Sequence, residues 1–127
     1  YERYCDTAAG IQCITDSTQI SSTRRSSFTL PNGNSGTALL LFLSSNEEEY
    51  IEVEQGLSAG KNADECIAYL SGIWEDVSGA SLSEIMTESR EDDIIWKFRI
   101  VSHDSDISIF AAADIDGVPY IVGARKY

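Results

Sequence analysis

The segment 106–122, DISIFAAADIDGVPYIV, decides the fold that this sequence predicts. Apolar residues recur at every second position from Ile107 to Ile115, which is the period of a β-strand with one buried face. The dipeptide Asp116-Gly117 follows, and this pair favours a type I′ turn. A turn there closes an antiparallel hairpin with three cross-strand pairs, which are Ile115 with Val118, Ala113 with Tyr120, and Ala111 with Val122.

A third strand is predicted at 94–102, just before this hairpin. Its apolar side chains share one face and its basic side chains share the other, so it fits a half-buried strand. The three strands then form an antiparallel meander. Pro119 lacks a backbone N–H on the side that faces away from its hairpin partner, which predicts that the final strand is an edge where it starts.

The apolar residues in the region before the meander recur with the spacing of an α-helix. An apolar residue recurs every three or four positions over 63–77, at Ala63, Cys66, Ile67, Leu70, Ile73, Trp74 and Val77. Asn62 with Glu65 is typical of a capping box, and Gly79 ends the helix. Gly72 costs about 1 kcal/mol inside a helix, which suggests a close approach to the sheet.

A second, shorter helix is expected next. Ser81 and Glu84 repeat the capping signature, and the apolar residues Leu82, Ile85 and Met86 would form its buried face.

The amino-terminal part of the chain predicts further strands. Residues 1–36 are rich in Ser and Thr, so we expect a loosely structured arm with one or two short strands. Residues 37–44 are apolar on both sides, which predicts a strand that is covered on both faces. The amino-terminal arm or a dimer partner would cover its second face. In 50–54 we expect Ile51 and Val53 to face inward and the glutamates to face solvent.

Together these segments predict a single α+β domain spanning residues 1–127. Its order is strands, helix, helix, three-strand meander. The simplest packing is a single antiparallel sheet of about five to seven strands with both helices on one face.

The charge of the chain excludes several partners. Twenty-one acidic and nine basic residues give a formal net charge of −12, which disfavours nucleic acids and anionic membranes. No apolar run approaches the length of about 18 residues that membrane insertion needs. A cluster of glutamates is a candidate interaction surface for a basic protein, with a solvated turn and strand face as the alternative: Glu47, Glu48, Glu49, Glu52 and Glu54.

Three cysteines, Cys5, Cys13 and Cys66, allow at most one internal disulfide bond. A bond that involves Cys66 would tie the amino-terminal arm to the helix, and a bond between Cys5 and Cys13 would close a short loop. The alternative is that Cys66 is a small buried apolar residue. Their spacing matches no zinc site.

The sequence contains no convincing catalytic or metal-binding set. His103 beside Asp104 is interpreted as a turn residue, since no nucleophile is placed to pair with it. Asp114 and Asp116 precede Gly117 as in a calcium loop, but a strand follows where further ligands are needed. We therefore predict no catalytic residues, no metal and no cofactor, and no enzyme activity.

Two classes of function follow from these observations. The first is a secreted acidic protein-binding domain of the effector, toxin or inhibitor type, a monomer or weak homodimer. The alternative is a ligand-sensing or pilin-like module cut from a larger extracytoplasmic protein, which the strand order and the abrupt end at Arg125-Lys126-Tyr127 favour. The chain also opens on Tyr1 and not on Met, as a processed product would. A sensing module should hold a cavity between sheet and helices, whereas an effector should hold a disulfide bond and no cavity.

Overall fold

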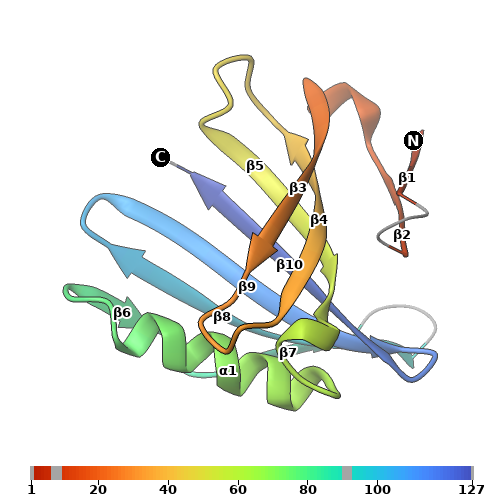
Figure 1. Cartoon of the computed structure of the whole chain (residues 1–127). Coiled ribbons are helices and arrows are strands. Elements are labelled where there is room, and N and C mark those ends of the chain that lie inside the picture. Colours follow the sequence, from red (N-terminus) through yellow and green to blue (C-terminus); the bar gives the residue numbers. More distant parts are fainter. Residues whose placement is uncertain (1, 7–9, 90–92, 127) are drawn as a thin grey trace.

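The computed structural model describes residues 2–6, 10–89 and 93–126. In this described part, the chain forms ten strands and one α-helix (Figure 1). The strands are β1 (Glu2–Asp6), β2 (Ile11–Thr15), β3 (Ser22–Thr29), β4 (Ser35–Phe42), β5 (Glu49–Gln55), β6 (Ala80–Leu82), β7 (Met86–Ser89), β8 (Ile95–His103), β9 (Asp106–Ile115) and β10 (Val118–Lys126). The helices are α1 (Ala63–Glu75) and two short 3₁₀ turns, η1 (Ser17–Gln19) and η2 (Gly56–Ser58).

Eight of the strands form one antiparallel sheet in the order β3-β4-β5-β10-β9-β8-β6, with β7 also paired to β8. The remaining two, β1 and β2, form a separate hairpin. The predicted α+β class, with two helices on a smaller sheet, is therefore wrong: the fold is mostly β, and α1 is the one α-helix in the described part of the chain.

The segment predicted as a second helix forms β6 and β7 instead. Ser83, between them, forms one backbone and one side-chain hydrogen bond with the β8 edge: its N–H donates to the Ile100 carbonyl, and its hydroxyl accepts from the Ile100 N–H. An unpaired sheet edge thus offers this short segment more backbone partners than one or two helical turns could.

The predicted hairpin is confirmed in its register. Ile115 pairs with Val118, and the pairing continues along β9 and β10 as expected. Asp116 and Gly117 have φ angles of 51° and 78°, as a type I′ turn requires. Pro119 lies before the point at which β5 joins β10, so β10 does begin as an edge.

The two faces of the sheet are covered by different parts of the chain. One, which we call the helix face, packs against α1 through residues that include Phe110, Ala112 and Ile121. The opposite, hairpin face packs against the β1–β2 hairpin in a cluster that includes Ile11 and Val53.

Residues 38–42 of the apolar strand β4 are buried on both faces, as predicted. The amino-terminal arm covers Leu39 and Leu41, whereas the side chains on the other face pack with Phe28 and Tyr50 of the neighbouring strands.

Helix α1 begins where the sequence predicts. The Asn62 side chain accepts a hydrogen bond of 2.9 Å from the Glu65 N–H, and the Asp114 carboxylate accepts another of 2.9 Å from the Ala63 N–H. The helix ends at Glu75, before Gly79. A Cβ atom on Gly72 would meet nothing within 4 Å, so the expected close approach of Gly72 to the sheet is wrong.

Candidate functional site

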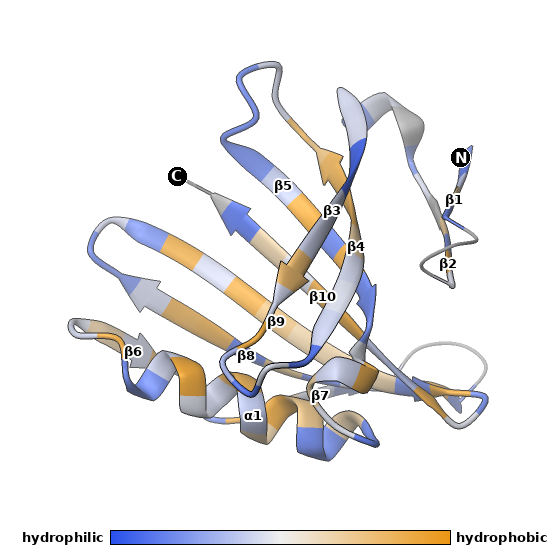
Figure 2. Ribbon diagram, viewed as in Figure 1, coloured by the Kyte–Doolittle hydropathy of each residue, from blue (hydrophilic) through white to orange (hydrophobic). Residues whose placement is uncertain are grey.

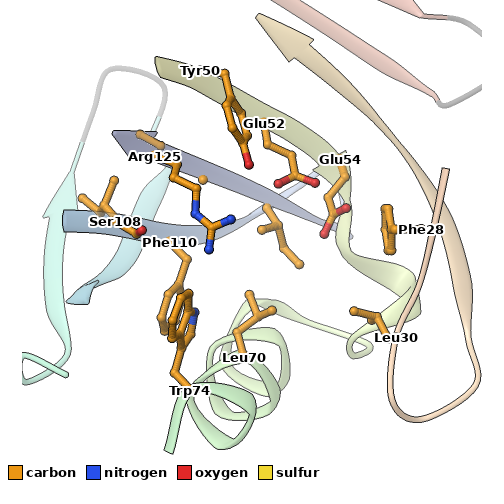
Figure 3. A pocket seen from close by; sticks show the side chains of 14 residues that line it. Phe28, Leu30, Tyr50, Glu52, Glu54, Leu70, Trp74, Ser108, Phe110 and Arg125 are labelled. Carbon is orange, nitrogen blue, oxygen red and sulfur yellow. The ribbon is translucent and has the colours of Figure 1, made fainter. Parts of the chain in front are cut away.

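A cavity of about 280 Å³ lies between α1 and the helix face of the sheet (Figure 3). Its walls come from β3, β5, α1, β9 and β10, so segments far apart in the sequence meet there. Most of the side chains that line it are apolar, and the main ones are Phe28, Leu30, Leu70, Trp74, Phe110 and Ile121.

Two glutamates of β5 line the same cavity. The alternation of β5 is visible as alternating hydrophilic and hydrophobic residues along the strand (Figure 2). Ile51 and Val53 pack in the cluster under the β1–β2 hairpin, so Glu52 and Glu54 face α1. Figure 3 shows both carboxyl groups pointing into the cavity.

The expectation that the β5 glutamates face solvent is wrong for Glu54, which is only 7% exposed. Glu52 is half-buried. The alternation identified correctly which residues share a face. It did not show that both faces are covered, because the covers are the β1–β2 hairpin and α1, which lie elsewhere in the sequence.

Glu54 has no hydrogen-bond or ion-pair partner among the described residues. Burial, with a smaller contribution from the negative charge of Glu52, raises the pKa of Glu54 to about 8. Burial also raises the pKa of Glu52, and the positive charge of Arg125 acts in the opposite direction on it. The Glu54 carboxyl is therefore mostly protonated and neutral at pH 7.

The cavity also contains a basic residue, Arg125 of β10. Figure 3 shows its guanidinium between Trp74 and Glu52. The guanidinium carbon lies 5.9 Å from the centre of the Trp74 ring, within the range of a cation–π interaction. Arg125 thus has both a carboxylate and an aromatic ring beside it, whereas no described residue gives Glu54 a cation or a hydrogen bond.

The structure separates the five glutamates of the predicted acidic surface into two groups. Glu47 and Glu48 are exposed in the β4–β5 turn and Glu49 is half-buried beside them, whereas Glu52 and Glu54 lie in the cavity. Glu47 forms an ion pair of 3.3 Å with Arg24. Only the turn group is placed to meet a large partner.

The sequence reasoning did not identify Arg125 or Trp74 as site residues. The predicted hairpin register held a usable signal for Arg125, because continuing it past Val122 places Arg125 on the same face as Ile121. No comparable signal existed for Trp74, whose position on the apolar stripe of α1 is equally typical of a core residue.

The predicted disulfide bond is wrong, because all three cysteines are free. In the β1–β2 pairing, Tyr4 lies opposite Cys13 and Cys5 lies opposite Gln12, so the two cysteines point to opposite faces of the hairpin. Cys66 lies on α1, across the sheet from both. Its thiol is buried and donates a hydrogen bond of 3.2 Å to the Gly56 carbonyl, which fits the alternative of a buried apolar residue.

The other polar residues considered from the sequence, His103 and Asp114, contact backbone groups. The His103 Nε2 lies 3.2 Å from the Ser78 carbonyl oxygen, at the end of β8. The carboxylate of Asp114 binds the first N–H of α1. Within residues 2–6, 10–89 and 93–126, no three His, Cys, Asp or Glu side chains come together as a metal site requires.

The chain matches no known protein family, no curated protein and no solved structure. Of the helices described, none has the length and apolar composition needed to span a bilayer.

Proposed function

We propose that this chain is a ligand-binding domain that holds a small amphiphilic molecule in the cavity between α1 and the helix face. The observation that carries the proposal is the carboxyl of Glu54, which lies inside a largely apolar cavity with no polar partner in the described part of the chain. Burying a carboxyl group without a hydrogen-bond partner costs a folded protein several kcal/mol. Apolar cavities that contain a few converging polar groups with shifted pKa values are typical of binding sites.

The two tryptophans of the chain provide a direct test. Trp74 lines the cavity, and Trp96 lines a separate pocket on the hairpin face. In W96F, Trp74 is the only tryptophan and reports on the cavity. In W74F, Trp96 reports on the opposite face and serves as the matched control.

A collection of small amphiphiles should contain compounds that change the fluorescence of W96F and leave that of W74F unchanged. The same compounds should raise the melting temperature of the wild type in a concentration-dependent way. Replacing Leu70 by Trp fills the cavity from α1 and should abolish this stabilisation. If no compound in the collection gives either signal, the proposal is wrong.

A second candidate is recognition of a basic protein through the acidic exterior. It is supported by the exposed glutamates of the β4–β5 turn and by the net charge of −12. The charge also argues against nucleic acid as the partner. Capture of one basic protein that weakens with added salt and is lost in the double variant E47K/E48K would support this candidate.

A secreted or extracytoplasmic location stays a prediction, as does a state between monomer and weak homodimer. The three free thiols do not require an oxidising compartment. Fractionation of the source cells and sedimentation of the purified chain would test the two predictions.

A further inference from the structure

We infer that the ligand of this cavity carries a protonated amine on an apolar body, and that the carboxylate of Glu54 receives the amine. This inference rests on the function proposed above and specifies the class of ligand.

The charges that line the cavity support a cationic ligand. Glu52, Glu54 and Arg125 are the acidic and basic residues that line the cavity, and the phenol of Tyr50 is a further titratable group among its lining residues. Arg125 offsets the charge of Glu52, whose pKa it acts to lower, and lies over Trp74. When Glu54 ionises, the cavity carries one negative charge more than it has positive charges. A ligand with a single positive charge restores the balance, and a ligand with a carboxylate would add to the imbalance.

The surroundings of Glu54 define the remainder of the ligand. Figure 3 shows its carboxyl group near Phe28 and above Leu30 and Leu70, which are side chains that cannot donate a hydrogen bond. An apolar body can lie against these three residues while its amine donates to Glu54. A cavity of about 280 Å³ has room for about nine non-hydrogen atoms, if each occupies roughly the volume of a water molecule. A short arylalkyl or alkyl amine has this size.

Binding of an amine should release one proton. Below about pH 8 the free protein holds a proton on Glu54, and the amine is already protonated in solution. The ammonium group then binds the carboxylate, and the Glu54 proton passes to the solvent. Affinity should therefore rise about tenfold for each pH unit below about pH 8, and it should level off above that value.

The experiment compares amines with alcohols of the same shape, using W96F as the reporter protein. The three pairs are 2-phenylethylamine with 2-phenylethanol, cyclohexylamine with cyclohexanol, and hexylamine with hexanol. Each compound is titrated at about pH 6, 7 and 8.5, with calorimetry in two buffers of different ionisation enthalpy to count the released protons. E54Q in the W96F background removes the ionisable group, and E48Q, in the exposed turn, is the matched control.

We expect at least one amine to bind more tightly than its alcohol, with an affinity that rises about tenfold from pH 6 to pH 7 and with release of about one proton. E54Q should lose both the preference and the pH dependence and should still bind the alcohol, whereas E48Q should behave as W96F does. If the alcohols bind and no amine binds more tightly, or if the affinity for the amines does not change with pH, the inference is wrong and the cavity remains a binding site. If neither amines nor alcohols bind, the inference is also wrong. Only a failure of the wider amphiphile collection would overturn the proposed function as well.

Discussion

Burial of the Glu54 carboxyl connects the folding equilibrium to pH. The unfolded chain releases this proton near the ordinary pKa of 4.5, whereas the folded protein holds it until about pH 8. Between these values the folded state binds more protons than the unfolded state does. The free energy of unfolding therefore falls as the pH rises through this interval, and above about pH 8 this group causes no further loss.

Replacing Glu54 by Gln should remove this dependence. At about pH 8.5 we expect E54Q to be more stable than the wild type by at most about 5 kcal/mol, and at about pH 4.5 we expect little difference. Urea unfolding at several pH values checks this prediction, with E48Q as the control that should follow the wild type. Parallel pH profiles for wild type and E54Q would show that the Glu54 carboxyl is not held neutral by the fold.

At the scale of single elements, the success of sequence reasoning depended on how local the determining interactions are. The β9–β10 hairpin could be predicted with its register because the two residues of its turn, Asp116 and Gly117, fix the pairing. The start of α1 could be predicted because Asn62 and Glu65 are three residues apart. Its second cap, Asp114, could not be predicted, because it lies on β9 and meets Ala63 only in the fold.

Non-local contacts decide the two features that were predicted wrongly, which are residues 81–86 and the exposure of the β5 glutamates. Residues 81–86 have an apolar spacing that either a short helix or a strand could satisfy, and the free edge of β8 decides the outcome. The cavity could not be predicted from β5 alone. The alternation of β5 gives two sets of side chains, and which set meets solvent depends on α1 and the β1–β2 hairpin.

Two glycines should respond in opposite directions to replacement by alanine. Gly72 lies inside α1 with open space around it, so G72A should raise the free energy of unfolding by about 0.5–1 kcal/mol through helix propensity. Gly117 has a φ angle of 78°, so G117A should lower the free energy of unfolding by about 1 kcal/mol. Urea unfolding measures both changes. Equal signs for the two variants would contradict the assigned conformations.

The three thiols should react at different rates because of the elements that carry them. Cys5 is on the exposed face of the β1–β2 hairpin, so we expect iodoacetamide to modify it first at about pH 8. Burial raises the pKa of Cys13, and burial raises that of Cys66 to about 11, so Cys13 should follow slowly and Cys66 should react only after unfolding. Mass spectrometry of the intact chain, with and without concentrated urea, measures this order. Fewer than three modified thiols in urea without reductant would indicate a disulfide bond.

For the molecule as a whole, the net charge of −12 should destabilise the folded state through self-repulsion. We expect moderate sodium chloride to raise the melting temperature by a few degrees, because it screens this repulsion. The exposed ion pair of Arg24 with Glu47 is too weak to reverse the effect when it is screened. Thermal unfolding in low and moderate salt, with sucrose as the control for general solute effects, measures the change. A melting temperature that falls as salt is added would contradict the prediction.

The position of β10 has a consequence for how the chain is made. This strand follows all the others in the sequence, yet it lies between β5 and β9 in the sheet. Until it pairs, the nascent chain consists of two ribbons with open edges, which neighbouring chains can extend. Joining the ribbons requires pairs such as Val53 with Val122, and such distant pairings slow folding. A chaperone that shields open strand edges should therefore matter most before residues 118–126 leave the ribosome.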